Sequence, residues 1–252
     1  MLTKVVILAD SLALPREGAD DIPYEATYPF LLEQRLRRYC RAESPVIMER
    51  GMRRRTIEYV LDEWFELVEL RRPHLVILHV GIVDCAPRIF LRRERQFIEN
   101  LRWARLRDFV LAFVHKHRAL IIRLRPRVYV PLESFERLVD QVVDKARQLR
   151  IPLVFVNIVS PPDEIENRSP GFQQNVRLYN QVLTSKANGT AVQLIDLNSL
   201  SAQRSRSKLL TGDGIHLTRE GHLLLACELE RIILNQLKPQ AAAFELAGSA
   251  AH

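Results

Sequence analysis

The segment KVVILADSLALPR, residues 4–16, joins a nearly continuous apolar run to a polar turn that begins at Asp10. A short run of this kind, rich in β-branched residues, predicts a strand that is covered on both faces. Four similar runs follow along the chain: SPVIMERG (44–51), HLVILHVG (74–81), IPLVFVNIVS (151–160) and AVQLIDL (191–197). Segments with helical periodicity separate them. Strands that alternate with helices predict an α/β protein with a parallel sheet between layers of helices.

The interval between the third and fourth runs is too long for a simple crossover. It extends from Gly81 to Pro152, whereas roughly one or two dozen residues are enough to connect parallel strands. We therefore predict a basic helical insertion at residues 88–147, beside the carboxyl edge of the sheet, where α/β folds bind their ligands. The chain is predicted to form one domain over residues 1–237, with a loosely ordered tail at 238–252.

Positive charge is concentrated in this insertion. The formal net charge of the chain is +7, but residues 88–127 alone hold twelve Lys or Arg and three acidic residues. Such a surface either is simply solvated or attracts an anionic substrate or an anionic membrane surface. Nucleic acid is disfavoured as a partner, because the arginines alternate with aliphatic residues and no nucleic-acid-binding motif accompanies them.

Composition favours a reducing compartment. The three cysteines are odd in number and lack metal-ligand spacing, which is typical of cytoplasmic proteins. The first residues predict a strand rather than a signal peptide, and no apolar window approaches the roughly 18 residues of a spanning helix. We expect a cytoplasmic protein, peripheral to the membrane if the insertion contacts lipid.

Residues able to do chemistry follow the predicted strands. Ser11 follows the first strand, Gly51 ends the second, and Asp213 and His216 lie after the fifth, within LTGDGIHLTREGH. Because parallel strands end at one edge of a sheet, we expect these residues to converge. Each also has a structural explanation, since Ser caps helices and Asp-Gly marks turns. Together they predict a serine nucleophile activated by His216, with Asp213 orienting the imidazole.

The order of these blocks resembles the SGNH (GDSL-type) hydrolase superfamily. ADSLALPR is similar to its first block, Gly51 to its second-block glycine and DGIHLTREGH to its last block. The resemblance implies a three-layer, flavodoxin-like fold with Ser11 as nucleophile, His216 as general base and Asp213 as its partner. Members act as esterases, lipases, carbohydrate deacetylases or acyltransferases. The pattern also resembles a bacterial subgroup associated with surface-polysaccharide gene sets.

The third block departs from the family pattern. It reads GIVD (81–84) where Gly-x-Asn-Asp is usual, so Val83 replaces a side chain that would bind the oxyanion. Losing one such donor costs about 3 kcal/mol in the transition state. Arg88 and Asn157 are candidate replacements. Otherwise the enzyme works with the backbone N–H groups of Ser11 and Gly51 alone, or the protein binds acyl groups without turnover.

We therefore predict a serine-dependent esterase or deacetylase that acts through an acyl-enzyme on an O-acylated small molecule or carbohydrate. The alternatives are an O-acyltransferase to a sugar hydroxyl and a catalytically impaired protein that docks on an anionic glycan or membrane. Arg16, Tyr24, Tyr28 and Val83 are predicted to contact the substrate. No cofactor and no metal site are expected, since no cluster of His, Cys or carboxylates has metal-ligand spacing.

Overall fold

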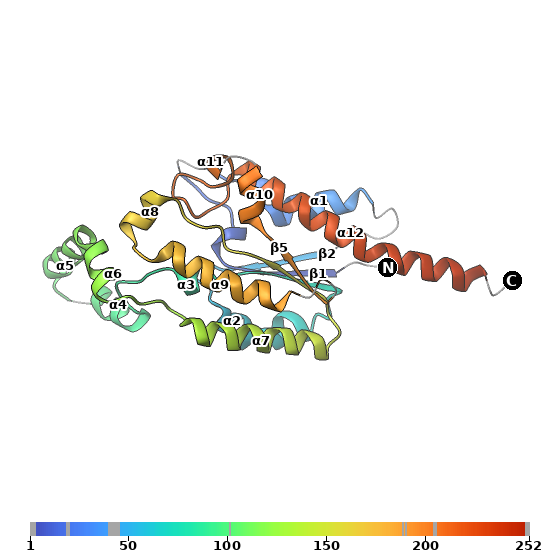
Figure 1. The fold of residues 1–252 in the computed structure, drawn as a ribbon, viewed down its shortest axis with the longest axis horizontal. Coiled ribbons are helices and arrows are strands. Elements are labelled where there is room, and N and C mark those ends of the chain that lie inside the picture. Colours follow the sequence, from blue (N-terminus) through green and yellow to red (C-terminus); the bar gives the residue numbers. More distant parts are fainter. Residues whose placement is uncertain are drawn as a thin grey trace.

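Five parallel strands form the centre of the molecule (Figure 1). The computed structural model describes residues 4–18, 21–39, 46–100, 102–187, 189, 191–203 and 206–249. The strands are β1 (Lys4–Ala9), β2 (Val46–Gly51), β3 (Leu75–His79), β4 (Leu153–Val156) and β5 (Val192–Ile195). Their order is β2-β1-β3-β4-β5, and every neighbouring pair is parallel. The predicted α/β class and five-stranded parallel sheet are confirmed.

The register of the sheet brings the strand ends to one level. Ala9, the last residue of β1, is aligned with Gly51 of β2 on one side and with His79 of β3 on the other. Residues that follow these strands therefore emerge next to one another at the carboxyl edge. Ser11 lies two residues beyond Ala9, which places it at this edge.

Helices cover both faces of the sheet in a three-layer arrangement (Figure 1). Val6 and Leu8 of β1 pack in the core shared with α2, α7 and α9, whereas Val5 and Ile7 pack in the core shared with α1 and α12. The division follows from the two-residue period of a strand, which sends successive side chains to opposite faces. The helices are α1 (Tyr28–Arg37), α2 (Ile57–Asp62), α3 (Ile82–Cys85), α4 (Arg92–Glu99), α5 (Ala104–Lys116), α6 (Arg118–Leu124), α7 (Leu132–Gln148), α8 (Asp163–Arg168), α9 (Phe172–Lys186), α10 (Leu197–Gln203), α11 (Arg206–Leu209) and α12 (Arg219–Ser249), with short turns η1 (Ser11–Ala13), η2 (Tyr24–Ala26) and η3 (Phe65–Glu69).

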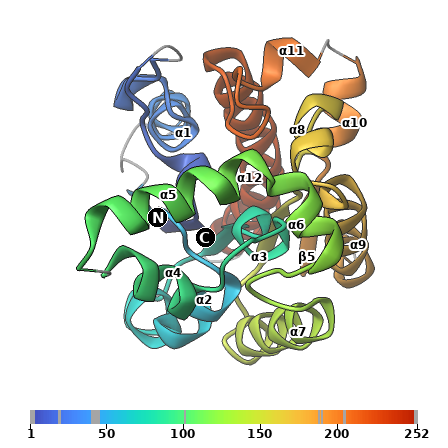
Figure 2. The same cartoon turned by 90° about the vertical axis from the view of Figure 1, so that its left-hand side faces the viewer.

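The insertion after β3 is helical, as predicted, but it is shorter than residues 88–147. Helices α4, α5 and α6, which we call the cap helices, lie beyond the carboxyl edge of the sheet (Figures 1 and 2). The predicted range also includes α7, and here the structure corrects it. Phe135, Val139 and Val142 of α7 are buried in the core against the sheet. This apolar stripe makes α7 part of the helical layer rather than of the cap.

The outer face of α5 presents aromatic side chains between basic ones. Phe109 and Phe113 are 68% and 53% exposed, and Trp103, just before the helix, is 75% exposed. Arg105 and Lys116 are exposed and lie on the same face as the two phenylalanines, at helical spacing. Contact of this face with an anionic membrane surface stays a prediction. Within the described part of the chain, no helix is both long enough and apolar enough to cross a membrane.

The C-terminal segment is helical for most of its length, and its loose ordering stays a prediction. Helix α12 continues to Ser249 and so occupies most of the predicted loosely ordered tail at 238–252. Positions 250–252 lie outside the described residues. The segment QAAAFELA is rich in strong helix formers, and it follows Pro239, which has no backbone N–H to donate within the helix.

A substitution at Gly81 tests the tight connection that follows β3. Gly81 has a φ of +125°, and an added Cβ would lie 2.7 Å from Ile158 Cδ1. Gly81→Ala therefore combines backbone strain with a clash in the core, and we expect the free energy of unfolding to fall by about 2–4 kcal/mol in urea denaturation. Gly171→Ala is the control, because Gly171 has a φ of +85° but no atom within 4 Å of the added Cβ. Its strain alone should cost about 1 kcal/mol, and equal losses in the two variants would contradict the packing argument.

Candidate active site

Ser11, His216 and Asp213 form one continuous chain of hydrogen bonds. Ser11 Oγ lies 3.0 Å from His216 Nε2, although the two residues are 205 positions apart in the sequence. His216 Nδ1 lies 2.7 Å from Asp213 Oδ2. With the Nδ1 proton donated to the carboxylate, Nε2 is left to accept the Ser11 proton. The arrangement is that of a nucleophile, a base and the acid that orients the base.

The turn after β1 holds Ser11 in place. Ser11 is the first residue of η1, and the side chain of Asp10 accepts a hydrogen bond from the backbone N–H of Leu12 at 2.9 Å. The N–H of Asp10 donates to the carbonyl of His79 in β3, at 3.3 Å. The nucleophile therefore emerges from a turn that is tied to the neighbouring strand.

The loop that carries His216 is organised by Asp213. Asp213 Oδ1 accepts hydrogen bonds from Thr211 Oγ1 at 2.8 Å and from the N–H groups of Ile215 and His216 at 3.0 Å each. Gly214 has a φ of +67°, which lets the chain turn back within this short loop. One carboxylate oxygen thus fixes the loop while the other orients the imidazole.

Arg16 contacts the same carboxylate. Its Nη1 lies 2.5 Å from Asp213 Oδ2, the oxygen that also faces His216. Burial alone would raise the pKa of Asp213, but hydrogen bonds from His216 and Arg16 hold it well below its usual range. Arg16 is predicted to contact the substrate, whereas the structure places its guanidinium on Asp213. No spacing in the sequence signals this pair, which is 197 residues apart.

Two backbone N–H groups are candidates for binding an oxyanion. The N–H of Ser11 donates to no other described residue, as expected for the first residue of a helical turn. The N–H of Gly51 donates to the carboxylate of Glu49 in the same strand. The sequence analysis does not include Glu49. Its only signal is an acidic residue two positions before the glycine, a spacing that puts both on one side of a strand.

The structure corrects Asn157 as a replacement for the missing amide, whereas Arg88 as an oxyanion donor stays a prediction. Asn157 Nδ2 donates to Asp196 Oδ1 at 2.6 Å, and its Oδ1 accepts from the N–H of Leu197 at 2.8 Å, so the side chain joins the ends of β4 and β5. Arg88 Nη2 donates to the carbonyl of Val83 at 3.0 Å. Val83, predicted to contact substrate, is only 8% exposed and belongs to the core. Burial of its apolar side chain stabilises this position of Val83.

Tyr28 is also corrected as a substrate contact. It is fully buried, with its ring between those of His79 and His222 at centroid distances of 5.6 and 5.9 Å. Tyr28 begins α1 and lies on its apolar face, which packs against the sheet, so its ring is buried. Tyr24 is half exposed and packs edge-on against Phe30, and its contact with substrate stays a prediction.

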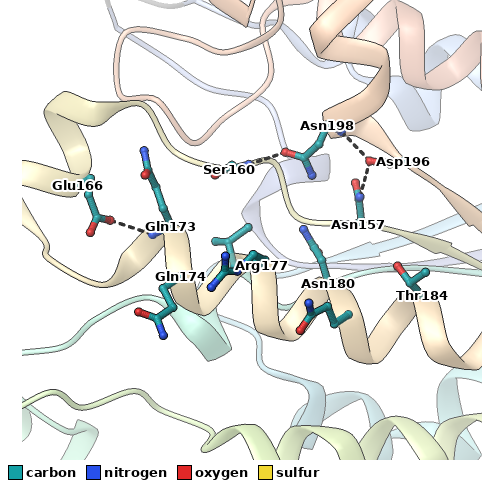
Figure 3. Close-up of a pocket in the computed structure, with 12 residues that line it drawn as sticks. Asn157, Ser160, Glu166, Gln173, Gln174, Arg177, Asn180, Thr184, Asp196 and Asn198 are labelled. Atoms are coloured by element: carbon teal, nitrogen blue, oxygen red, sulfur yellow. Dashed lines mark hydrogen bonds between the residues drawn. The ribbon is translucent and has the colours of Figure 1, made fainter.

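A polar cavity of about 730 Å³ lies beside α9, and none of Ser11, Asp213 and His216 lines it (Figure 3). Many of its polar side chains are already hydrogen-bonded within the protein. Asp196 accepts from Asn157, and Asn198 accepts from the N–H of Ser160 at 2.8 Å. These hydrogen bonds join the loops after β4 and β5. The polar side chains of the cavity are therefore explained by a structural role.

The fold and the chain of hydrogen bonds at its carboxyl edge define the class of serine ester hydrolases. The sequence then gives the family: the chain belongs to the GDSL-like Lipase/Acylhydrolase family, whose model matches residues 10–224. The predicted resemblance to GDSL-type hydrolases and the prediction of a serine ester hydrolase are confirmed by this membership. The surface-polysaccharide subgroup stays a prediction. Comparison with curated proteins found no match.

Solved structures with the same fold come from several bacteria. The chain is similar to a lipase/acylhydrolase from Enterococcus faecalis, with a TM-score of 0.66 and 14% identity over 93% of this chain and 97% of that one. It is similar to a psychrotrophic esterase from Pseudoalteromonas sp. (TM-score 0.56, 14% identity, 94% and 99% covered). It also matches a catalytic mutant of an acetylxylan esterase from Geobacillus stearothermophilus (0.56, 16%, 91% and 93%). At these identities the matches establish the shared fold.

Two buried carboxyl groups and two buried imidazoles lie beneath this edge. Burial raises the pKa of Asp10 to about 8, against the hydrogen bond from Leu12, and raises that of Asp84 to about 7, against the bond from the N–H of Ile57. Burial lowers the pKa of His79 to about 3 and of His222 to about 4. All four groups are therefore held towards their uncharged forms.

Stability should fall as pH rises from about 6.5 to 8. Across this window Asp10 and Asp84 hold protons in the folded protein that the unfolded chain has already released above about pH 4, and a native state that binds more protons loses stability as pH rises. The two buried histidines act oppositely, but only below their unfolded pKa of about 6.5. We expect the free energy of unfolding, measured in urea, to fall by about 2 kcal/mol over the window.

Asparagine variants separate the two groups. Asp84→Asn should flatten the part of the pH curve near pH 7, and Asp10→Asn the part near pH 8. The control Asp62→Asn, at an exposed position, should leave the slope unchanged. A curve that is flat from pH 6.5 to 8 in the unmodified protein would contradict the assignment.

Proposed function

We propose that this protein hydrolyses a short acyl ester, such as an acetyl ester, on a hydroxyl group of a carbohydrate or other small molecule, with Ser11 as the nucleophile. The observation that carries the proposal is the 3.0 Å contact of Ser11 Oγ with His216 Nε2, continued at 2.7 Å to Asp213. A serine hydroxyl is a weak nucleophile until a neighbouring base accepts its proton. His216 is in position to do so.

The reaction runs in two halves. Ser11 Oγ forms a bond to the acyl carbon while its proton passes to His216 Nε2, and the carbonyl electron pair moves to the oxygen. Collapse of this intermediate breaks the ester bond, and His216 returns the proton to the leaving alcohol oxygen. Water, deprotonated by His216, then attacks the acyl-enzyme and releases the acid. Asp213 stabilises the imidazolium in both halves.

The oxyanion is bound by two backbone donors in this proposal. They are the N–H groups of Ser11 and Gly51, since Val83 offers no side-chain donor and the Asn157 amide donates to Asp196. Losing one donor of this kind typically lowers kcat by about a hundredfold or more. We therefore expect a slow hydrolase.

A carbohydrate ester is the substrate class we favour. Among the solved structures with this fold is an acetylxylan esterase, and the family is one of lipases and acylhydrolases. The Ser11–His216 pair requires only an accessible ester carbonyl. Both comparisons are therefore compatible with an acetylated sugar.

Labelling with a fluorophosphonate probe tests Ser11 directly. We expect rapid labelling of the unmodified protein, none of Ser11→Ala, and a decrease of roughly a hundredfold or more in labelling rate for His216→Ala. Ser134→Ala, on α7, is the control and should label normally. A Ser11→Ala variant that still labels, or still hydrolyses p-nitrophenyl acetate, would refute the proposal.

Adding a sugar acceptor and analysing the products by mass spectrometry separates hydrolysis from acyl transfer.

Glu49 provides a second test, because its carboxylate occupies the N–H of Gly51. A negative charge at this donor opposes the formation of an oxyanion there. Glu49→Gln should therefore raise kcat for p-nitrophenyl acetate by about three- to tenfold, with little change in KM. Glu33→Gln, on α1, is the control and should leave kcat unchanged. A decrease in kcat in Glu49→Gln would show that Glu49 supports the Gly51 loop rather than competing with the oxyanion.

A further inference from the structure

Three adjoining cavities lie between the cap helices and the carboxyl edge of the sheet. Their volumes are about 450, 380 and 300 Å³. Tyr129 lines both the first and the second, and Arg88 and Arg118 line both the second and the third. Met52, which follows Gly51 in the sequence, lines the first, and Ile215, which precedes His216, lines the third. The first and third cavities therefore border the loops that carry Gly51 and His216, while Ser11, Asp213 and His216 themselves line none of the three.

Arginines dominate the lining of this row. Arg53, Arg54, Arg55 and Arg92 line the first cavity. Arg88, Arg118 and Arg168 line the third. Among the described residues that line the three cavities, none is Asp or Glu. The walls thus carry a large positive charge and no acidic group.

The arginines of the third cavity are held mostly by neutral groups. The guanidinium of Arg88 lies 4.3 Å from the centroid of the Tyr129 ring, and it donates to the carbonyl of Val83. Arg118 Nε donates to Ser169 Oγ at 3.0 Å, and its Nη2 donates to the carbonyl of Pro87 at 3.2 Å. These contacts orient the guanidinium groups without neutralising them.

In the first cavity, Arg92 is held in the same way. Its Nη2 donates to Thr56 Oγ1 at 3.1 Å, and its guanidinium lies 5.1 Å from the centroid of the Tyr129 ring. Arg55 differs, because it pairs with Glu63 at 2.9 Å. Arg53 and Arg54 are exposed at the rim.

Partial burial of Arg88 and Arg118 without a carboxylate partner is unfavourable for the free protein. Burial lowers the pKa of Arg88 and of Arg118, and the neighbouring charge of Arg168 lowers that of Arg118 further. The Nε of Arg88 is buried and has no hydrogen-bond partner. Buried donors are normally satisfied, so the Arg88 guanidinium is incompletely hydrogen-bonded within the described part of the protein.

We propose that these cavities bind the anionic groups, carboxylate or phosphate, of an acidic carbohydrate ester and hold its acyl group against Ser11. Arginine suits this role, because its planar guanidinium forms paired hydrogen bonds with carboxylate and phosphate oxygens. Because the row borders the loops that carry Gly51 and His216, it accommodates an extended chain with an anionic group on either side of the ester. The inference rests on the proposed function for the reacting ester, but anion binding itself requires no turnover.

Two pairs of variants test the two ends of the row. Arg53→Gln/Arg54→Asn removes charge beside Gly51, and Arg118→Gln/Arg168→Gln removes it beside Ile215. We expect each pair to lower kcat/KM for an acetylated oligogalacturonide, or for an acetylated sugar phosphate, by about tenfold or more. Hydrolysis of a neutral acetylated xylo-oligosaccharide should change less than about twofold. Arg137→Gln/Arg147→Gln, exposed on α7, is the matched control and should leave both activities unchanged.

Comparing the losses on the two anionic substrates shows which anionic group, carboxylate or phosphate, the cavities bind. A greater loss on the oligogalacturonide indicates carboxylate recognition, and a greater loss on the sugar phosphate indicates phosphate recognition. Equal losses on anionic and neutral esters, or no loss on any, would overturn the proposal. Unfolding midpoints of each pair, measured in parallel, show whether a loss arises from misfolding, and the direct binding measurement below does not depend on those variants.

Binding measured without catalysis separates this inference from the proposed function. Titration calorimetry on Ser11→Ala, with unesterified oligogalacturonide and with glucose 6-phosphate, should give binding that weakens by about tenfold or more between 20 and 300 mM salt. Neutral xylo-oligosaccharide should bind more weakly than both. Binding of Ser11→Ala to phosphatidylglycerol vesicles, with no binding of either sugar ligand, would overturn the proposal in favour of lipid docking. Anion binding together with a failure to hydrolyse any ester would retain this site and reject the hydrolase.

Discussion

The candidate active site depends on one contact, between the hydroxyl of Ser11 and the imidazole of His216. The two residues lie at opposite ends of the chain, and the parallel sheet brings them together. Because all five strands end at the same edge, the turn after β1 and the loop before α12 share one region of space. The oxyanion candidate Gly51 joins them there through its alignment with Ala9. Without parallel order, these residues would have no common edge.

The same edge holds several polar groups in unfavourable surroundings. Asp10 and Asp84 are fully buried carboxyl groups that each leave one oxygen without a partner, and Gly81 has a backbone conformation open only to glycine. Groups of this kind reduce stability, and folds keep them where they position functional residues. Here Asp10 caps the turn that carries Ser11, and Asp84 binds the N–H of Ile57 at the start of α2. Stability and geometry are therefore coupled at the site.

The cap helices change the electrostatics of this edge. The cap helices contribute to arginine-lined cavities that border the loops carrying Gly51 and His216. If these cavities bind anionic groups as we propose, substrate selection rests on charge as well as on the acyl group. The absence of a side-chain donor at Val83 fits this arrangement, since binding energy from distant anionic groups can position an ester that the oxyanion site stabilises only weakly.

Local patterns in the sequence determined the strands, the parallel sheet, the helical insertion and the grouping of Ser11, Gly51, Asp213 and His216, because each is marked by periodicity or by a block around one residue. Tertiary structure alone decided the rest. It paired Arg16 with Asp213, buried Tyr28 and Val83, placed α7 in the helical layer, and joined Asn157 to Asp196. The physical reason is that a side chain's partner depends on which distant segments meet it, and long-range packing leaves no signal in local spacing.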